Sequence, residues 1–286
     1  MPRPRIALAL GSGGWKGMAH IGVLRALAEA EIRPAVYAGS SVGALVAAAA
    51  AHDISLVEIE ALAERLLRDP LFRVDVAGLL RHGRRARSLY RSAPLRRLCA
   101  ELFGDTTFGD LRTRVVVSTV DVETAALLCW GLPSLPDAPV ADAVYASCAI
   151  PGFLPPGRVR GRRCMDGAVL DPLALGGVAP LADLVIAVVL DVPPAGAGAP
   201  AFATAHTLWW HAQAIVMRRL AHDTIARWKG PPLMVLRLGL GGVDPVQARE
   251  PGPLIQAGYE AARRALAEWE GGAPAAGGIG ESTPVT

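Results

Sequence analysis

Short, fully apolar runs alternate with stretches of helical apolar spacing along most of this chain. Ile6–Leu10 is apolar throughout, and after a glycine-rich loop Ile21, Leu24 and Ala28 fall three to four residues apart. Continuous apolar runs are typical of strands buried on both faces, and the three-to-four spacing is typical of helices that cover them. The pattern therefore predicts an α/β protein with a mainly parallel central sheet.

The same alternation continues to about residue 270. Four further apolar runs predict strands, at residues 35–38, 114–121, 184–191 and 233–238, and a hairpin-like segment lies at Leu127–Trp130. Helical patterns occupy residues 44–51, 204–228 and 254–269. Residues 271–286 are of low complexity and are expected to form a disordered tail. We therefore predict one domain over residues 1–270.

The sequence Gly39-Ser40-Ser41-Val42-Gly43 lies between a predicted strand and the alanine-rich helix that follows it. A Gly-x-Ser-x-Gly turn at such a junction is strained, and its glycines avoid a collision with the neighbouring strand or helix. The turn exposes the Ser41 hydroxyl at a helix N-terminus, where the dipole stabilises an alkoxide-like oxygen. This pattern predicts a nucleophile; a close strand-to-helix crossing without chemistry is the alternative interpretation.

A glycine loop at residues 11–17 joins the first predicted strand to the first predicted helix. Consecutive backbone N–H groups at a helix N-terminus bind an anion. A dinucleotide is disfavoured because Lys16 occupies the third glycine position of Gly-x-Gly-x-x-Gly, and the P-loop pattern is absent. Adjacent strands lie about 5 Å apart, so we expect this loop to face Ser41 and to receive the oxyanion of acyl transfer.

The composition is rich in small apolar residues and poor in aromatic ones. Apolar residues make up 52% and aromatic residues 5%, which suits a core of Ala, Val and Leu. The four cysteines have neither Cys-x-x-Cys nor zinc-like spacing and are predicted to be reduced core thiols. The first apolar run is too short for a signal peptide or a membrane span, so a cytoplasmic protein is expected.

The most basic stretch is residues 65–97, where ten arginines stand against two aspartates although the whole chain carries a formal charge of only +3. Apolar residues, mostly leucine, are interleaved with these arginines. The combination suits peripheral contact with anionic lipid at the inner membrane surface, each cation near the membrane contributing about 1 kcal/mol. A solvated helical face is the alternative, whereas nucleic acid is disfavoured because stacking platforms are absent.

A second candidate site is Asp166-Gly167-Ala168, late in the chain. Asp-Gly is by itself a strong hairpin-turn signal. Its position in an α/β chain that already offers a nucleophile favours a catalytic carboxylate instead. A proline-punctuated apolar loop at residues 146–156 comes shortly before it and is expected to pack over another part of the fold.

Together these motifs resemble those of the bacterial patatin-like phospholipases. The resemblance runs from Ile6 to about Leu266 and rests on the glycine loop with the helix start after it, the serine turn, the stretch at residues 147–152 and Asp166-Gly167-Ala168. It implies a three-layer α/β/α patatin-like fold and an acyl hydrolase domain over residues 1–270. It also implies a Ser41/Asp166 dyad that hydrolyses acyl lipids, with residues 12–17 as the glycine loop of the family.

Two residues of the glycine loop depart from the family's pattern. Ser12 stands where glycine is usual, and Lys16 stands where arginine is common, so the positive charge is kept but the planar fork is lost. The amides of Gly13, Gly14 and Trp15 are the expected oxyanion donors. The bulky indole of Trp15 is expected either to contact an acyl chain or to pack at the edge of the loop.

In the expected reaction, Asp166 accepts the Ser41 proton directly and no histidine takes part. An exposed aspartate with a pKa of about 3.9 is a weak base, so an apolar pocket is expected to raise its pKa. Ile150, Phe153 and Leu154 are the candidates for that pocket.

Two other hypotheses fit the same sequence. One is an α/β-hydrolase-type esterase whose Ser-Asp-His triad draws on His206, His211 or His222. The other is a lipid-binding regulatory protein with little turnover. No cofactor is expected, and no metal either, because ligand spacing is missing; activity should therefore be independent of calcium. Lysophospholipids, diacyl phospholipids and neutral glycerides all present the required carbonyl, and the sequence specifies no oligomeric state.

Overall fold

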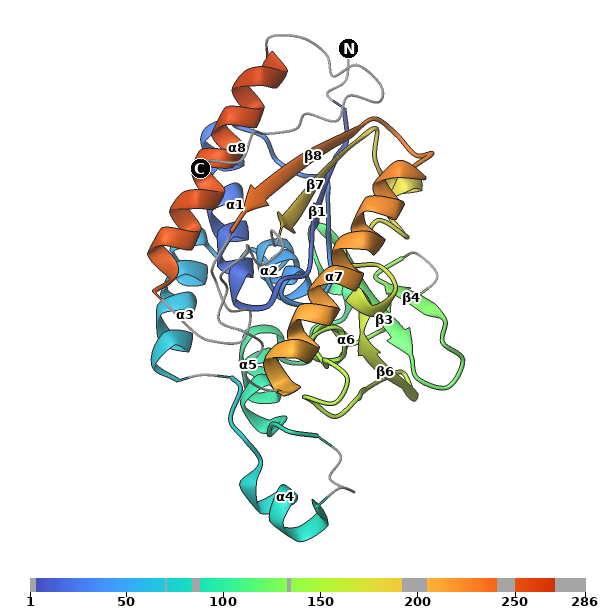
Figure 1. Cartoon of the computed structure of the whole chain (residues 1–286). Helices are drawn as coiled ribbons and strands as arrows, with labels where there is room; N and C mark the ends of the chain where they lie inside the picture. Colours follow the sequence, from blue (N-terminus) through green and yellow to red (C-terminus); the bar gives the residue numbers. More distant parts are fainter. Residues whose placement is uncertain are drawn as a thin grey trace.

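The computed structural model describes residues 4–69, 71–83, 88–132, 135–191, 205–240 and 250–270 (Figure 1). In this part of the chain eight strands form one sheet, in the order β5-β6-β3-β2-β1-β7-β8, with β4 paired to β3. The strands are β1 Ile6–Leu10, β2 Val36–Gly39, β3 Arg114–Asp121, β4 Leu127–Trp130, β5 Gly157–Val159, β6 Arg162–Asp166, β7 Leu184–Asp191 and β8 Leu233–Gly239. The α-helices are α1 Ala19–Glu29, α2 Val42–Ala51, α3 Leu56–Arg68, α4 Val76–His82, α5 Ala93–Phe103, α6 Val140–Ser147, α7 Ala205–Ala226 and α8 Pro251–Glu270.

The centre of the sheet is parallel and one edge is antiparallel. Strand β1 pairs in parallel with β2 and β7, and parallel pairing continues from β2 to β3 and from β7 to β8. Strand β3 pairs antiparallel with β4 and with β6. The mainly parallel sheet predicted from the apolar runs is confirmed, and the loops that follow β1 and β2 lie at the same edge of the sheet because the two strands are parallel neighbours.

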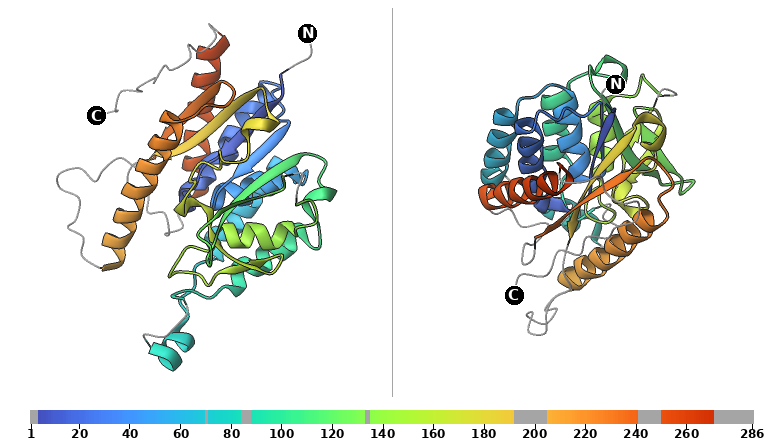
Figure 2. Two further views of the ribbon diagram at one scale, coloured as in Figure 1. Left: turned by 90° about the vertical axis from the view of Figure 1, so that its right-hand side faces the viewer. Right: turned by 90° about the horizontal axis from the view of Figure 1, so that it is seen from above.

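Helices cover both faces of the sheet, as the views in Figure 2 show, with α7 on the face opposite to α1 and α8. Side chains of β1 divide between the two sides: Leu8 and Leu10 join the larger core cluster, and Ala7 and Ala9 join the smaller one. Successive side chains of a strand point to opposite faces, so a fully apolar strand requires cover on both. The predicted three-layer α/β/α arrangement is confirmed.

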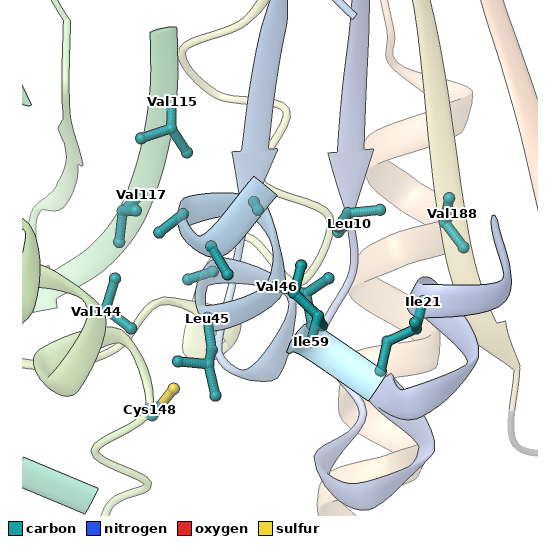
Figure 3. Packing of buried hydrophobic residues seen from close by; sticks show 14 of the residues in the cluster. Leu10, Ile21, Leu45, Val46, Ile59, Val115, Val117, Val144, Cys148 and Val188 are labelled. Atoms are coloured by element: carbon teal, nitrogen blue, oxygen red, sulfur yellow. The ribbon is translucent and has the colours of Figure 1, made fainter. Parts of the chain in front are cut away.

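The larger core is built from short side chains that let the elements approach closely. Figure 3 shows Leu10 and Val188 of adjacent strands facing Val46 of α2 and Ile21 of α1. Helices α1 and α8 cross at glycines: a methyl group at Gly22 would come within 1.8 Å of the carbonyl oxygen of Ile255. The alanine-rich composition therefore fits a core that depends on close contact between backbones.

One turn predicted from the sequence differs from the structure. The hairpin interpretation of Asp166-Gly167 is wrong, because Asp166 ends β6 and a short 3-10 helix follows. The turn between β5 and β6 falls instead at Arg160 and Gly161, whose φ angles of 48° and 82° suit a type I′ turn. The predicted tail, residues 271–286, lies outside the described residues. All four cysteines are free thiols, and three of them are buried.

Candidate active site

Ser41 lies at the junction where β2 turns into α2, as the glycine pattern predicts, but the expected exposure of its hydroxyl is wrong because Ser41 is buried. Two contacts explain the glycines of this turn. A Cβ at Gly39 would lie 2.3 Å from the carbonyl oxygen of Gly43, and a Cβ at Gly43 would lie 2.0 Å from the carbonyl oxygen of Leu10. Both distances are far below van der Waals contact with backbone that cannot move away. The turn therefore brings Ser41 directly beside the end of β1.

The backbone of Ser41 is strained. Its φ of 57° with ψ of −127° is a conformation that L-residues rarely adopt, and such residues cost about 1–3 kcal/mol each. The Ser41 amide donates to Oγ of Ser147 at 2.9 Å, and the Ser41 carbonyl accepts from the Ala44 amide at 2.9 Å. These bonds hold the strained conformation at the N-terminus of α2, where the helix dipole favours negative charge on Oγ.

Asp166 reaches Ser41 from the antiparallel edge of the sheet. It is the last residue of β6 and stands opposite Thr119 of β3. Ser41 Oγ donates to Asp166 Oδ2 at 2.7 Å, across 125 positions of sequence, and the Ala168 amide donates to Oδ1 at 2.9 Å. One carboxylate oxygen of Asp166 is therefore fixed by a backbone amide, and the other accepts the hydrogen bond from the serine hydroxyl.

Burial sets the acidity of this carboxyl group. Asp166 is 4% exposed, and its removal from water raises its pKa to about 7, against the lowering effect of the bonds from Ala168 and Ser41. The turn after α6 contributes to the cover, because the Asp166 amide donates to the Ala149 carbonyl at 3.1 Å. Phe153 and Leu154 in that turn are buried in the larger core. The direction of the pKa shift agrees with the prediction from sequence.

The glycine loop is fixed at two points beside Ser41. The Gly11 amide donates to the Val188 carbonyl of β7 at 3.1 Å, and the Ser12 amide donates to the Pro172 carbonyl at 2.8 Å. Gly13 then precedes a 3-10 helix that begins at Gly14. The first amides of a helix have no partner within it, so this loop presents donors at its N-terminal end.

The two residues that depart from the family's pattern are Ser12 and Lys16. The Ser12 hydroxyl donates to Sδ of Met217 on α7 at 3.6 Å. The Lys16 side chain is buried, with 1% of its surface exposed. Trp15 is half-buried and packs against the larger core, which favours the packing interpretation of its indole.

His20 is a site residue that sequence patterns did not single out. It is fully buried on α1, and its Nε2 lies 2.8 Å from the Gly11 carbonyl oxygen. Burial lowers the pKa of His20 to about 4, so the imidazole is neutral near pH 7. Because a carbonyl only accepts, Nε2 carries the proton. His20 therefore fixes the start of the glycine loop.

Asp171 connects the segment that follows Asp166 to the glycine loop. It is buried, and its carboxylate accepts from the amides of Leu173 at 3.3 Å and Gly176 at 2.7 Å. Burial raises the pKa of Asp171. The turn that Asp171 stabilises presents the Pro172 carbonyl to Ser12. Neither Asp171 nor Ser147 has a periodic signal, although a polar residue within an apolar stretch indicates a buried hydrogen bond.

Within the described ranges, no group of three or more His, Cys, Asp or Glu side chains is placed to hold a metal ion. None of the helices in the described part of the chain is both long and apolar enough to cross a membrane. Calcium independence and cytoplasmic location stay predictions.

A sheet between two helical layers, with a serine in a strained strand-to-helix turn against a buried aspartate, has the architecture of a serine hydrolase. The sequence profile of the patatin-like phospholipase family matches residues 8–178, and the chain belongs to this family.

Relatives support this membership. An uncharacterized NTE family protein of Mycobacterium tuberculosis (strain ATCC 25618 / H37Rv) is 36% identical over 194 residues, or 68% of this chain and 51% of the relative. Patatin-like phospholipase domain-containing protein 7 of Rattus norvegicus is 29% identical over 170 residues, covering 59% of this chain and 12% of that protein. This chain thus spans about half the length, or less, of these relatives. The solved structure of VipD from Legionella pneumophila shares the fold, with a TM-score of 0.51 at 14% identity, covering 93% of this chain and 67% of VipD.

Proposed function

We propose that this protein is a serine lipid acyl hydrolase that cleaves carboxylic esters of phospholipids, lysophospholipids or related acyl lipids. The main support for this proposal is the 2.7 Å hydrogen bond from Ser41 Oγ to Asp166 Oδ2, which joins two buried side chains. Membership of the patatin-like phospholipase family supports a lipid ester as the substrate class.

In the first half of the reaction, Asp166 takes the proton of Ser41 as Oγ attacks the ester carbonyl carbon. The carbonyl π electrons move to oxygen and form a tetrahedral oxyanion. Collapse of this intermediate breaks the bond to the alcohol, and Asp166 returns the proton to the leaving oxygen. The product is an acyl-Ser41 enzyme and a free alcohol.

In the second half, water takes the place of the alcohol. Asp166 accepts a proton from this water while its oxygen attacks the acyl carbon, and the resulting intermediate releases Ser41 Oγ, which regains its proton from Asp166. A pKa of about 7 makes the carboxyl a base and an acid of useful strength near neutral pH. One carboxyl group therefore serves both halves of the reaction.

The amides of Gly13, Gly14 and Trp15 are the proposed oxyanion donors. They lie at the N-terminal end of the 3-10 helix that follows β1, beside the serine turn that follows β2. Each well-placed donor of this kind contributes about 10²–10³ in rate. The bonds to Val188, Pro172 and His20 described above support the loop on three sides.

The geometry favours the dyad over the Ser-Asp-His triad. A triad needs an imidazole between the hydroxyl and the carboxylate, whereas Ser41 and Asp166 are in direct contact. His222 is exposed and His211 is half-buried on α7, while the side chain of His206 lies outside the described part. A regulatory lipid-binding protein is disfavoured because binding alone gives no reason to maintain a strained serine.

The test is a lipid panel assayed with wild type, Ser41→Ala and Asp166→Asn, together with a fluorophosphonate probe that labels activated serines. We expect probe labelling and ester hydrolysis in the wild type, no labelling of Ser41→Ala, and a loss of about 10²–10⁴ in kcat for Asp166→Asn. Alanine variants of the three α7 histidines are the matched control and should retain activity. Full labelling and turnover in Asp166→Asn, with loss in a histidine variant, would replace the dyad by the triad.

A further inference from the structure

Helix α4 lies on a segment that stands away from the rest of the described chain in Figure 1 and in the left view of Figure 2. We call this segment, residues 73–83 and 88–91, the α4 projection. None of the residues in α4 is buried. Val74, Val76 and Leu80 are 46%, 55% and 84% exposed. Single exposed apolar side chains are ordinary, but three of them on one projecting segment indicate an interaction site.

Cations accompany these apolar side chains. Arg73, Arg81 and Arg91 are exposed on the same projection. Residues 65–97 as a whole carry ten arginines against two aspartates, whereas the entire chain has a charge of +3, so the remainder is net negative. Within the described part of the projection these arginines stand against Asp75. Arg73 pairs with Asp69 and Arg91 lies 3.6 Å from Asp75, whereas Arg81 forms no ion pair with another described residue. That combination is complementary to an anionic lipid surface, in which cations meet headgroups and apolar side chains enter the acyl boundary.

The stem of the projection is bonded to the turn that covers Asp166. The Leu89 and Tyr90 amides donate to the carbonyls of residues 152 and 153 at 3.0 and 2.8 Å. Shortly before these residues, the Ala149 carbonyl accepts the Asp166 amide. The stem of the projection is therefore linked to Asp166 through the turn that follows α6.

An aromatic cluster reinforces this attachment. Phe72 contacts Tyr90 edge-to-face with ring centroids 5.5 Å apart, and Tyr90 stacks on Phe153 at 5.7 Å. Phe153 in turn contacts Trp209 of α7 at 4.6 Å. Aromatic pairs at these separations contribute about 0.5–1.5 kcal/mol each beyond their buried area. The cluster holds the stem against the turn and against the helix on the other face of the sheet.

We propose that the α4 projection docks this protein on an anionic membrane surface, with Val76 and Leu80 entering the headgroup region and the arginines contacting lipid phosphates. Docking through this segment tethers the turn that covers Asp166 to the bilayer through the stem. The proposal goes beyond the chemistry of the dyad, because binding does not require Ser41 to react.

Vesicle flotation of full-length protein tests the proposal, in a Ser41→Ala background so that the lipid stays intact. We expect binding to vesicles of phosphatidylcholine mixed with phosphatidylglycerol, little binding to phosphatidylcholine alone, and weaker binding at high salt. Arg81→Gln should lower partition about fivefold, which corresponds to about 1 kcal/mol for one cation. Leu80→Ser should lower it about tenfold through lost apolar burial.

Matched controls lie elsewhere on the surface. Val57 on α3 is 77% exposed, and Arg264 on α8 is exposed, so Val57→Ser and Arg264→Gln remove the same chemistry without touching the projection. Both should bind vesicles as the parent does. Equal binding to neutral and anionic vesicles, or equal loss in the projection variants and the controls, would overturn the proposal. The proposal would also be wrong if Leu80→Ser bound vesicles as the parent does and the projection instead bound an RNA or a protein.

An activity assay distinguishes failure of the docking proposal from failure of the proposed reaction. With Ser41 restored, Leu80→Ser should hydrolyse a water-soluble short-chain ester at the wild-type rate while losing about tenfold on the anionic vesicles. Absence of hydrolysis on every substrate, with anionic vesicle binding that still depends on Leu80, would refute the reaction and leave the docking surface in place. Equal loss on both substrates would refute the docking role.

Discussion

The serine turn and the α4 projection are built in opposite ways. Ser41 and Asp166 are 6% and 4% exposed and are held by bonds to surrounding backbone, whereas Leu80 is 84% exposed and none of α4 is buried. The first region leaves no room for an extra methyl group, and the second presents side chains that touch little of the protein. The comparison indicates that the serine turn can form only if its backbone contacts are kept within fractions of an ångström. Membrane binding by the projection is instead expected to depend on charge and exposed apolar area, whose contributions add roughly independently.

Replacing a glycine in each region gives the largest predicted difference. In Gly43→Ala the new methyl group would lie 2.0 Å from the Leu10 carbonyl oxygen, and the adjacent strand cannot move without disrupting the sheet. We expect destabilisation of about 4 kcal/mol or more, or failure to fold. In Gly83→Ala nothing lies within 4 Å of the new atom, and only the φ of 50° is unfavourable, at about 1–3 kcal/mol. Urea unfolding of both variants measures the difference, and equal midpoints would contradict it.

The pH dependence of the unfolding free energy tests whether Asp166 is buried, which the comparison of the two regions assumes. Its folded-state pKa of about 7 is above the unfolded value, so its stabilising contribution is complete below about pH 4 and is lost as pH rises through 7. Relative to Asp166→Asn, the wild type should lose a few kcal/mol of unfolding free energy across this range. The comparison with Asp166→Asn also cancels the contribution of His20, because the lowered pKa of His20 makes stability rise with pH in both proteins. A difference between the two proteins that is constant with pH would exclude a raised pKa.

Activity should follow the same titration. Since Asp166 must be ionised to accept the Ser41 proton, kcat/KM on a soluble ester should rise about tenfold between about pH 6 and pH 8, with a midpoint near the pKa of about 7. Leu80→Ser should show the same midpoint, because the projection does not contact the carboxylate. A profile that is flat in this range, with chemistry limiting, would show that Asp166 is not the base.

The fold was predictable where apolar runs are continuous. Strands β1, β3 and β7 occupy the residues that the sequence predicts, since burial on both faces leaves a run that is apolar for most of its length. Strands β5 and β6 were missed because they are short and carry exposed arginines at an antiparallel edge. Helix α6 was missed because its eight residues are too few for a clear helical period.

The site was predictable to a similar degree. Motifs identified Ser41 and Asp166, but their contact across 125 positions follows from β6 pairing with β3, which no local pattern encodes. His20 and Ser147 were not assigned roles because each acts through one hydrogen bond to another segment, and Asp171 was not because it shapes the turn whose Pro172 carbonyl meets the Ser12 amide. Such partners depend on tertiary packing rather than on spacing along the chain.

The smallest predicted effect concerns the stability of the projection variants. Leu80→Ser removes a side chain that is 84% exposed, so little apolar contact is lost and the unfolding free energy should change by no more than about 0.5 kcal/mol. The same substitution is expected to weaken vesicle binding about tenfold. Thermal or urea unfolding of Leu80→Ser beside Val57→Ser measures this, and the two should match wild type. A loss above about 2 kcal/mol would mean that Leu80 packs within the folded protein, and the division between a tightly built turn and a freely exposed projection would then be wrong.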